Sequence, residues 1–292
     1  MGKRILLFLL TNLAIMLVLS LILSLLGVGG YVSPEGRLQM VPLMIFCLVW
    51  GMGGAFLSLQ MSRWIAKRSM GVHLIDGRTG NADLDWLYTT VGNLTAQANL
   101  PMPEVGVYDS AEVNAFATGP SKKRSLVAVS TGLLQSMEHR EVEAVLGHEI
   151  GHIANGDMVT MTLLQGVINA FVLFFARLAA FAVRMMVHEK IAWVAGFVVR
   201  IALEIILGIL GSLVTAWFSR QREFRADAEG ARLAGRDSMV AVLRRLATTT
   251  DRIDTSKPAL AAFKISDRKA WLTAFSTHPP LAERIAALES GR

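Results

Sequence analysis

Two histidines four residues apart, with a glutamate between them, lie in the stretch VLGHEIGHIANGD at residues 145–157. On an α-helix, residues four apart project side by side, so the imidazoles of His148 and His152 can share one tetrahedral zinc ion. Glu149 lies further round the helix, where its carboxylate can reach a zinc-bound water without competing as a ligand. This spacing is typical of metalloproteases, in which the glutamate accepts a proton as the water attacks a peptide carbonyl. Because so short a pattern also arises by chance, the assignment needs a third ligand.

A candidate third ligand follows a long apolar segment, in the stretch WFSRQREFRADAEGARLAG. Glu223 and Asp227 are four residues apart and share one face of a predicted helix. Glu223 would complete a His₂Glu zinc site, one ion per chain, with the fourth position left to water. Asp227 would accept the free imidazole N–H of His148 and so fix its tautomer and orientation. The alternative is an exposed helix face on which Glu223 pairs with Arg220 or Arg222.

The helix that carries the two histidines has predicted ends and a face of small residues. Glu138 and Glu141 suit its first turn, and the Asn155-Gly156 pair suits its end. A glycine inside a helix costs about 1 kcal/mol relative to alanine, so we expect a closely packed neighbour that offsets this cost. The small face comprises Ala144, Gly147, Gly151 and Ala154.

The composition indicates a membrane protein. Of the 292 residues, 53% are hydrophobic and 18% are charged, whereas soluble domains are about 45–50% apolar and about 25% charged. The net charge of +6 could suggest nucleic acid, but no basic stripe interleaved with aromatic residues occurs, so nucleic acid is not an expected partner. Anionic lipid headgroups explain the basic excess better. The single cysteine, Cys47, excludes an internal disulfide.

Four apolar segments are candidates for crossing the bilayer, at residues 5–26, 38–62, 158–176 and 191–219. The first is predicted to be an uncleaved anchor, because its apolar core is too long for a signal peptide and no cleavage site follows. Arg200 and Glu204 lie inside the fourth segment, and charges at mid-helix are costly in lipid. The third and fourth segments are therefore predicted to be either a spanning pair or a partly shielded hairpin.

Basic residues cluster before the first apolar segment and after the second, that is, at the two ends that lie on the same side of the membrane. Lys3 and Arg4 precede the first segment, and Arg63, Lys67 and Arg68 follow the second. By the positive-inside rule both flanks are cytoplasmic, which predicts a multi-pass protein with its termini and the histidine motif in the cytoplasm.

The polar part between the segments predicts an α+β region. Residues 81–100 are predicted to be helical, and residues 104–109 and 125–130 are predicted to be strands separated by a Gly-Pro turn. We divide the chain into a membrane anchor (1–62), a catalytic part with the HEIGH helix (63–157), a second apolar hairpin (158–219) and a C-terminal part with the third ligand (220–292). The predicted fold is a mainly α integral membrane protein with four apolar helices and a cytoplasmic zincin-like α+β domain that carries a small sheet.

Four stretches, in this order around the apolar segments, closely resemble the HtpX family of bacterial membrane proteases, which is related to the CAAX prenyl endopeptidases. They are LVAVSTGLLQSM, HEIGHIANGDMVTMTLLQG, WFSRQREFRADA and THPPLAERIAAL. The resemblance covers nearly the whole chain. It implies a zinc metalloendopeptidase of the bacterial inner membrane that degrades misfolded or damaged membrane proteins as part of quality control and the stress response. The zinc ligands would be His148, His152 and Glu223, and the base would be Glu149.

The resemblance also implies two substrate-binding residues. Asn114, in an edge strand, would lie against the backbone of the bound peptide. His278, in the His-Pro motif, would approach the active site and stabilise the oxyanion. Without the resemblance, Asn114 reads equally as a turn cap and His278 as a residue at the start of a helix.

Two other classes of protein are compatible with parts of the chain. In a transporter, Arg177, Arg200 and Glu204 would line a polar path, although a large polar insertion is not typical of that class. In a pseudoenzyme the metal would only stabilise the fold, but a purely structural site has no use for Glu149. Since no G-x-x-x-x-G-K-[ST] motif occurs, we expect substrate segments that are already unfolded or exposed.

Overall fold

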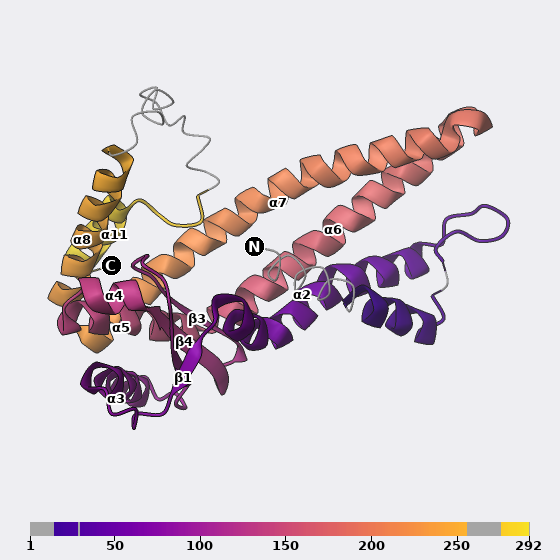
Figure 1. The fold of residues 1–292 in the computed structure, drawn as a ribbon. Helices are drawn as coiled ribbons and strands as arrows, with labels where there is room; N and C mark the ends of the chain where they lie inside the picture. Colours follow the sequence, from indigo (N-terminus) through magenta and orange to yellow (C-terminus); the bar gives the residue numbers. More distant parts are fainter. Residues whose placement is uncertain (1–14, 29, 256–275, 292) are drawn as a thin grey trace. The chain divides into compact units, whose positions relative to one another are not determined.

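A computed structural model describes residues 15–28, 30–255 and 276–291, with side chains placed up to residue 247 and again from residue 276. The described chain is mainly helical and carries one small mixed sheet, as predicted (Figure 1). It divides into two compact units. The apolar unit comprises the described residues of Met1–Leu59 and Thr160–Thr215. The sheet unit comprises Gln60–Val159 and the described residues of Ala216–Arg292.

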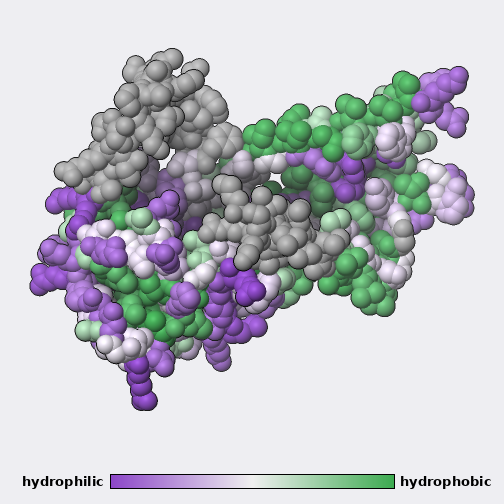
Figure 2. All heavy atoms as spheres, in the orientation of Figure 1, coloured by the Kyte–Doolittle hydropathy of each residue, from purple (hydrophilic) through white to green (hydrophobic). Residues whose placement is uncertain are grey.

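Three helices among the described residues are long and apolar enough to cross a membrane. They are α2 (Met40–Met70), α6 (Asp157–Met186) and α7 (Glu189–Ala234). The sequence predicted four such helices. The described part of the first predicted segment is a shorter apolar helix, Ile15–Leu25, and residues 5–14 lie outside the described residues. Figure 2 shows hydrophobic side chains on the outer surface of these helices, as expected for segments that face lipid.

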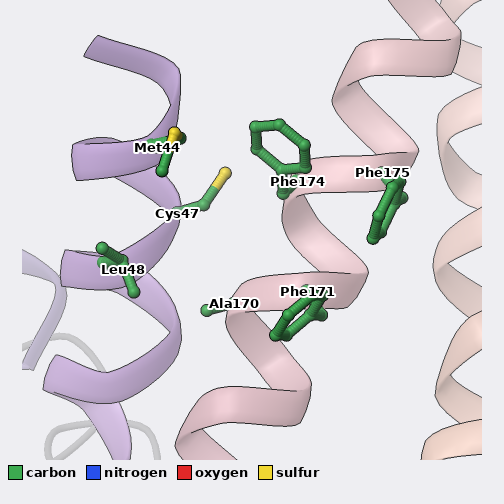
Figure 3. A pocket seen from close by; sticks show the side chains of 7 residues that line it. All are labelled: Met44, Cys47, Leu48, Ala170, Phe171, Phe174 and Phe175. Atoms are coloured by element: carbon green, nitrogen blue, oxygen red, sulfur yellow. The ribbon is translucent and has the colours of Figure 1, made fainter. Parts of the chain in front are cut away.

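Glycines allow close contacts between helices in the apolar unit. A Cβ on Gly51 of α2 would collide with the backbone of Ala170 in α6, and a Cβ on Gly166 would lie 3.1 Å from the Cα of Met52. The close approach that small residues permit between membrane helices is therefore present. Beside this contact, α2 and α6 line an open apolar pocket of about 190 Å³ into which Cys47 points (Figure 3).

One pair of charged residues joins two helices of the apolar unit. Arg177 of α6 donates a hydrogen bond to Glu204 of α7 at 3.4 Å, and its guanidinium lies 5.0 Å from the centroid of the Phe46 ring. This pairing satisfies two of the charges that could otherwise have indicated a transport path.

The sheet unit holds four described strands in the order β1-β2-β4-β3, with β2 and β4 parallel and the outer pairs antiparallel. The strands are β1 (His73–Ile75), β2 (Glu104–Tyr108), β3 (Ala115–Ser121) and β4 (Arg124–Ser130). The helices of this unit, besides the ends of α2, α6 and α7, are α3 (Ala82–Gln97), α4 (Thr131–Ser136), α5 (His139–Asn155), α8 (Arg236–Thr255) and α11 (Leu281–Glu289).

The predicted strands at residues 104–109 and 125–130 correspond to β2 and β4, but the predicted Gly-Pro turn between them is wrong. Gly119 and Pro120 lie inside β3, and the chain reverses at Lys122 and Lys123. The pairing of β3 with β4 shifts register between Thr118 and Ser121, and Gly119 has a φ of 147°. A bulge on an edge strand accommodates both glycine and proline, which is why the pair does not end the strand.

The last turns of α2 are held against the sheet. Arg63 and Lys67 both pair with Glu104 at the start of β2, at 3.2 Å and 3.0 Å. Helix α2 therefore runs past the predicted end of its apolar segment at residue 62 and continues to Met70.

The core of the sheet unit lies between the sheet, α3, α5 and α8. The apolar face of α5 is buried there, including Val142, Leu146 and Ile150, which are all less than 2% exposed. This packing fixes the orientation of α5 about its own axis. The opposite face of the helix therefore presents the two histidines in a defined direction.

Candidate metal centre

Local interactions set both ends of α5. The backbone N–H of Glu138 donates to the carboxylate of Glu141 at 2.9 Å, the arrangement of a capping box. Gly156 ends the helix in the left-handed conformation, with a φ of 68°. The predicted start and end of this helix are confirmed.

The small-residue face of α5 packs against α7, the helix that carries Glu223. A Cβ on Gly147 would lie 3.3 Å from the Cα of Gly230, and a Cβ on Gly151 would lie 3.0 Å from the carbonyl oxygen of Ala226. The expected close neighbour is therefore α7. Larger residues at these positions would separate the two helices, so the glycines bring the side chain of Glu223 close to the histidines.

Three potential ligand atoms converge between α5 and α7. The Nε2 atoms of His148 and His152 are 3.1 Å apart, and they lie 3.7 Å and 3.5 Å from the nearer carboxylate oxygens of Glu223. Zinc bonds of 2.0–2.1 Å in a tetrahedral site place the ligand atoms about 3.3 Å from one another. The observed spacing fits that geometry.

Each histidine also contacts a carboxylate through its other ring nitrogen. The Nδ1 of His148 lies 2.9 Å from Asp227 Oδ1, and the Nδ1 of His152 lies 2.7 Å from Asp157 Oδ2. In the neutral imidazoles, the hydrogen bond to Asp157 assigns the ring proton of His152 to Nδ1, and the nearby carboxylate of Asp227 favours the same tautomer of His148. The two Nε2 lone pairs then face each other across 3.1 Å, an arrangement that is repulsive by itself and that a bound cation stabilises. The donor set therefore fits zinc.

An arginine holds Asp227 in place. The Nε and Nη2 atoms of Arg284, in α11, donate to the two carboxylate oxygens of Asp227 at 2.6 Å each. This bidentate pair is buried, and the Nη1 atom lies 3.6 Å from a carboxylate oxygen of Glu223. One side chain thus orients the histidine partner and approaches the third candidate ligand.

His278 lies beside the same carboxylate. Its Nδ1 is 2.9 Å from Glu223 Oε2, and 62% of its side chain is exposed. The structure therefore brings His278 to the rim of the centre. The contact with Glu223 engages Nδ1 of the ring and not Nε2.

The environment keeps the acidic groups charged. Burial raises the pKa of Glu223, but the hydrogen bond from His278 and the attraction of His148 and His152 in their protonated forms outweigh it and lower the pKa to about 2. Burial likewise raises the pKa of Asp227, and the hydrogen bonds from Arg284 and His148 reverse that effect and lower it.

The alternative of an exposed face around Glu223 is wrong, because Glu223 is only 1% exposed. Arg222 does lie nearby, with its Nε 3.6 Å from Glu223 Oε1, but no hydrogen bond joins these two atoms, each of which is buried.

Glu149 and Asn114 line one cavity together with the metal centre. This cavity has a volume of about 210 Å³ and is also bordered by His148, Glu223 and His278. Glu149 is half-buried and follows His148 directly on α5. Asn114 is exposed and immediately precedes β3, the edge strand.

Two residues of the centre were not identified from the sequence. Asp157 reads as an ordinary acidic residue in the first turn of α6, and its proximity to His152 depends on the reversal at Gly156. Arg284 is 57 residues away from Asp227 along the chain, too far for local spacing to pair them. The only signal for either residue is its place inside two of the stretches that resemble a known family.

Comparison with known proteins gives similarity along the full chain. A family model described as Peptidase family M48 matches residues 81–292. The "Protease HtpX homolog" of Bacillus licheniformis is 52% identical over 297 residues, covering 99% of this chain and all of that relative. The "Protease HtpX" of Aeromonas hydrophila is 48% identical over 294 residues, covering 98% of this chain and 99% of that relative.

The fold is also similar to that of a protein of known structure. The crystal structure of S. mikatae Ste24p superposes with a TM-score of 0.65 at 17% sequence identity, covering 99% of this chain and 67% of that one. This similarity concerns the arrangement of helices and strands.

Proposed function

Because the chain belongs to peptidase family M48, we propose that it is a membrane-bound, zinc-dependent endopeptidase that cleaves misfolded or damaged membrane proteins at the cytoplasmic face of the bacterial inner membrane. The assignment as a metalloprotease follows directly from the family and from the relatives named as proteases. The recognition of the HtpX family from the sequence is confirmed by the same similarities.

The observation that carries the proposal is the convergence of His148, His152 and Glu223. Their ligand atoms lie within 4.8 Å of one another, and both imidazoles turn Nε2 toward the common point. These three residues would hold the metal. When bound there, zinc lowers the pKa of a coordinated water and polarises a peptide carbonyl.

The remaining steps are assigned to side chains of this chain. The carboxylate of Glu149 accepts a proton from the attacking water and returns it to the leaving amine nitrogen. Asp227 and Asp157 hold the imidazoles in the orientation that ligation needs. His278 donates from Nε2 to the oxygen on which negative charge develops, and Asn114 binds the peptide backbone beside the edge strand.

Charge distribution supports the cytoplasmic orientation. Arg63, Lys67 and Arg68 follow the apolar part of α2. Helices α2, α6 and α7 have the length and hydropathy of membrane spans, which supports a lipid bilayer as the environment of the apolar unit. The basic residues after α2 and the three apolar helices together support a multi-pass membrane protein whose metal centre is cytoplasmic.

The test of the mechanism replaces Glu149 with glutamine. Glu149→Gln removes the base and leaves the ligands, so purified protein in detergent should retain one zinc per chain while cleavage of casein falls by about 10²- to 10⁴-fold. The matched control is Glu143→Gln, the same change six residues earlier on α5, which should cleave like the wild type. Activity of Glu149→Gln close to that of the control would refute the assigned base.

A further inference from the structure

The cavity that contains the metal centre extends along an apolar wall. Helix α8 supplies Met239, Val242, Leu243 and Leu246, whose spacing of three, four and seven residues places them on one helix face. The first three are at most 2% exposed and form the buried base of the wall, and Leu246 is its partly exposed member. Val145, one turn before Glu149 on α5, faces the same space. Among the polar residues that line the cavity, His148, His278 and Arg284 each lie within 3.7 Å of the carboxylate of Glu223.

The size of this space suits one large side chain. The whole cavity, with the metal centre included, has a volume of about 210 Å³, compared with roughly 150 Å³ for an apolar cavity that accepts benzene. An apolar wall gives water few hydrogen-bond partners, so water in that part of the cavity is readily displaced by an apolar group.

The position of the cavity identifies what fills it. Glu149 and His148 border the same space, so a group bound in this cavity lies beside the proposed base and a proposed zinc ligand. Strand β3 lies at the edge of the sheet, and its residue Ala115 also lines the cavity. A peptide running along this edge would direct alternate side chains to opposite sides, and one of them would enter the cavity.

We propose that the wall formed by Met239, Val242, Leu243 and Leu246, with Val145 opposite, is a specificity pocket that selects a large apolar side chain directly beside the scissile peptide bond. This inference rests on the proposed endopeptidase function and adds the substrate class. Large apolar residues are buried in folded proteins, so such a pocket selects segments that have already lost their native packing.

The preference is measurable from cleavage products. We would digest reduced, denatured casein with the full-length protein in detergent and identify the new termini by mass spectrometry. One of the two positions that flank the cleaved bond should be enriched in Leu, Phe, Met or Ile. In a matched pair of peptides, replacing that residue with alanine should lower kcat/KM at least about tenfold, because each missing methylene in an apolar pocket costs about 10-fold or more.

Substitutions in the wall test the assignment to α8. Leu246→Trp reduces the volume, so the preference should move from Leu and Phe toward Ala and Ser at the same position. Leu246→Ala enlarges the volume and should raise the ratio of kcat/KM for Phe or Trp to that for Leu. The control is Ala241→Trp, which places the same bulk on an exposed position of the same helix and should keep the wild-type profile. Zinc content and circular dichroism identify any variant that does not fold.

The outcomes separate this inference from the function it rests on. If wild-type protein with one zinc per chain cuts casein without an apolar preference, or if both folded Leu246 variants keep the wild-type profile, the pocket is refuted and the endopeptidase assignment stands. If zinc-loaded protein cuts no denatured substrate at all, the endopeptidase assignment fails first. A shift in the Leu246 variants alone, with Ala241→Trp unchanged, supports the pocket.

Discussion

The two halves of α7 use one continuous helix in opposite ways. Between residues 189 and 215 its large apolar side chains face outward, and Ile205, Ile206 and Leu210 are each at least half exposed. Between residues 216 and 234 it buries charged groups, and Glu223 and Asp227 are each only 1% exposed. Apolar side chains on the outside suit lipid, whereas buried carboxylates are stable only with partners. Helices α5 and α11 supply these partners to the carboxylates in the second half of α7.

The comparison shows that a carboxylate on this helix has different surroundings on each side of residue 215. Glu204 pairs with one arginine and Glu223 approaches several cationic or ligating groups. Identical substitutions in the two halves should therefore separate a role in packing from a role at the metal centre.

The largest expected difference is between Glu223→Gln and Glu204→Gln. An amide is a poor zinc ligand, so Glu223→Gln should weaken zinc binding by more than about 100-fold, beyond the effect of losing a residue that only orients a ligand. Glu204→Gln should bind zinc with unchanged affinity. Competition with a chromogenic chelator measures both values on folded protein, and equal affinities in the two variants would move the third ligand elsewhere.

The next effect concerns the carboxylates behind the histidines. Asp227→Asn and Asp157→Asn should each weaken zinc binding by about 10- to 100-fold, because an amide no longer fixes the Nδ1–H tautomer. Zinc affinity at neutral pH provides the readout, and the temperature of unfolding in a chelator provides the control for folding. Unchanged affinity in either variant would limit that aspartate to a structural role.

A pair of glycine substitutions compares the packing of the two halves. Gly230→Leu inserts a side chain where a Cβ would already lie 3.0 Å from the backbone nitrogen of His148, so it should destabilise the protein by about 1–3 kcal/mol. Gly208→Leu points into open space and should leave the stability unchanged or higher. Thermal unfolding in detergent distinguishes the two, and similar losses would contradict the difference in packing.

The smallest effect concerns the start of α5. The hydrogen bond from Arg245 lowers the pKa of Glu141 in the folded protein, so this group stabilises the fold above its unfolded pKa of about 4.5 and loses that contribution as the pH falls through the lower folded value. Glu141→Gln should therefore cost about 1 kcal/mol at pH 7, and the difference from the wild type should shrink below pH 4. Denaturant unfolding of chelator-treated protein measures it; a difference independent of pH would exclude the ionised pair.

The sequence predicted the parts of the centre that depend on local periodicity. The four-residue spacings of His148 with His152 and of Glu223 with Asp227 hold on any helix, and the glycines on α5 indicated a close neighbour. The pairs of Asp157 with His152 and of Arg284 with Asp227 depend on a helix reversal and on long-range packing, which local spacing does not encode.

Strands β1 and β3 were not predicted, because the local sequence carries too little information about them. Strand β1 has only three residues, so it offers too few positions for an alternating pattern to stand out. Strand β3 contains Gly119 and Pro120, which usually indicate a turn, and only its pairing with β4 shows that they belong to a bulge. The apolar segments were identified by length and hydropathy alone. The expected continuation of the fourth segment into the helix of Glu223 is confirmed, because α7 runs unbroken from Glu189 to Ala234.

The bulge at Gly119 and Pro120 limits how another chain can add to the sheet. Pro120 offers no N–H, and Gly119 departs from extended backbone, so a guest strand can form a regular ladder only with residues 115–118. This pairing segment of four residues begins directly after Asn114. Its shortness favours weak, reversible pairing with a bound peptide over edge-to-edge aggregation of the sheet.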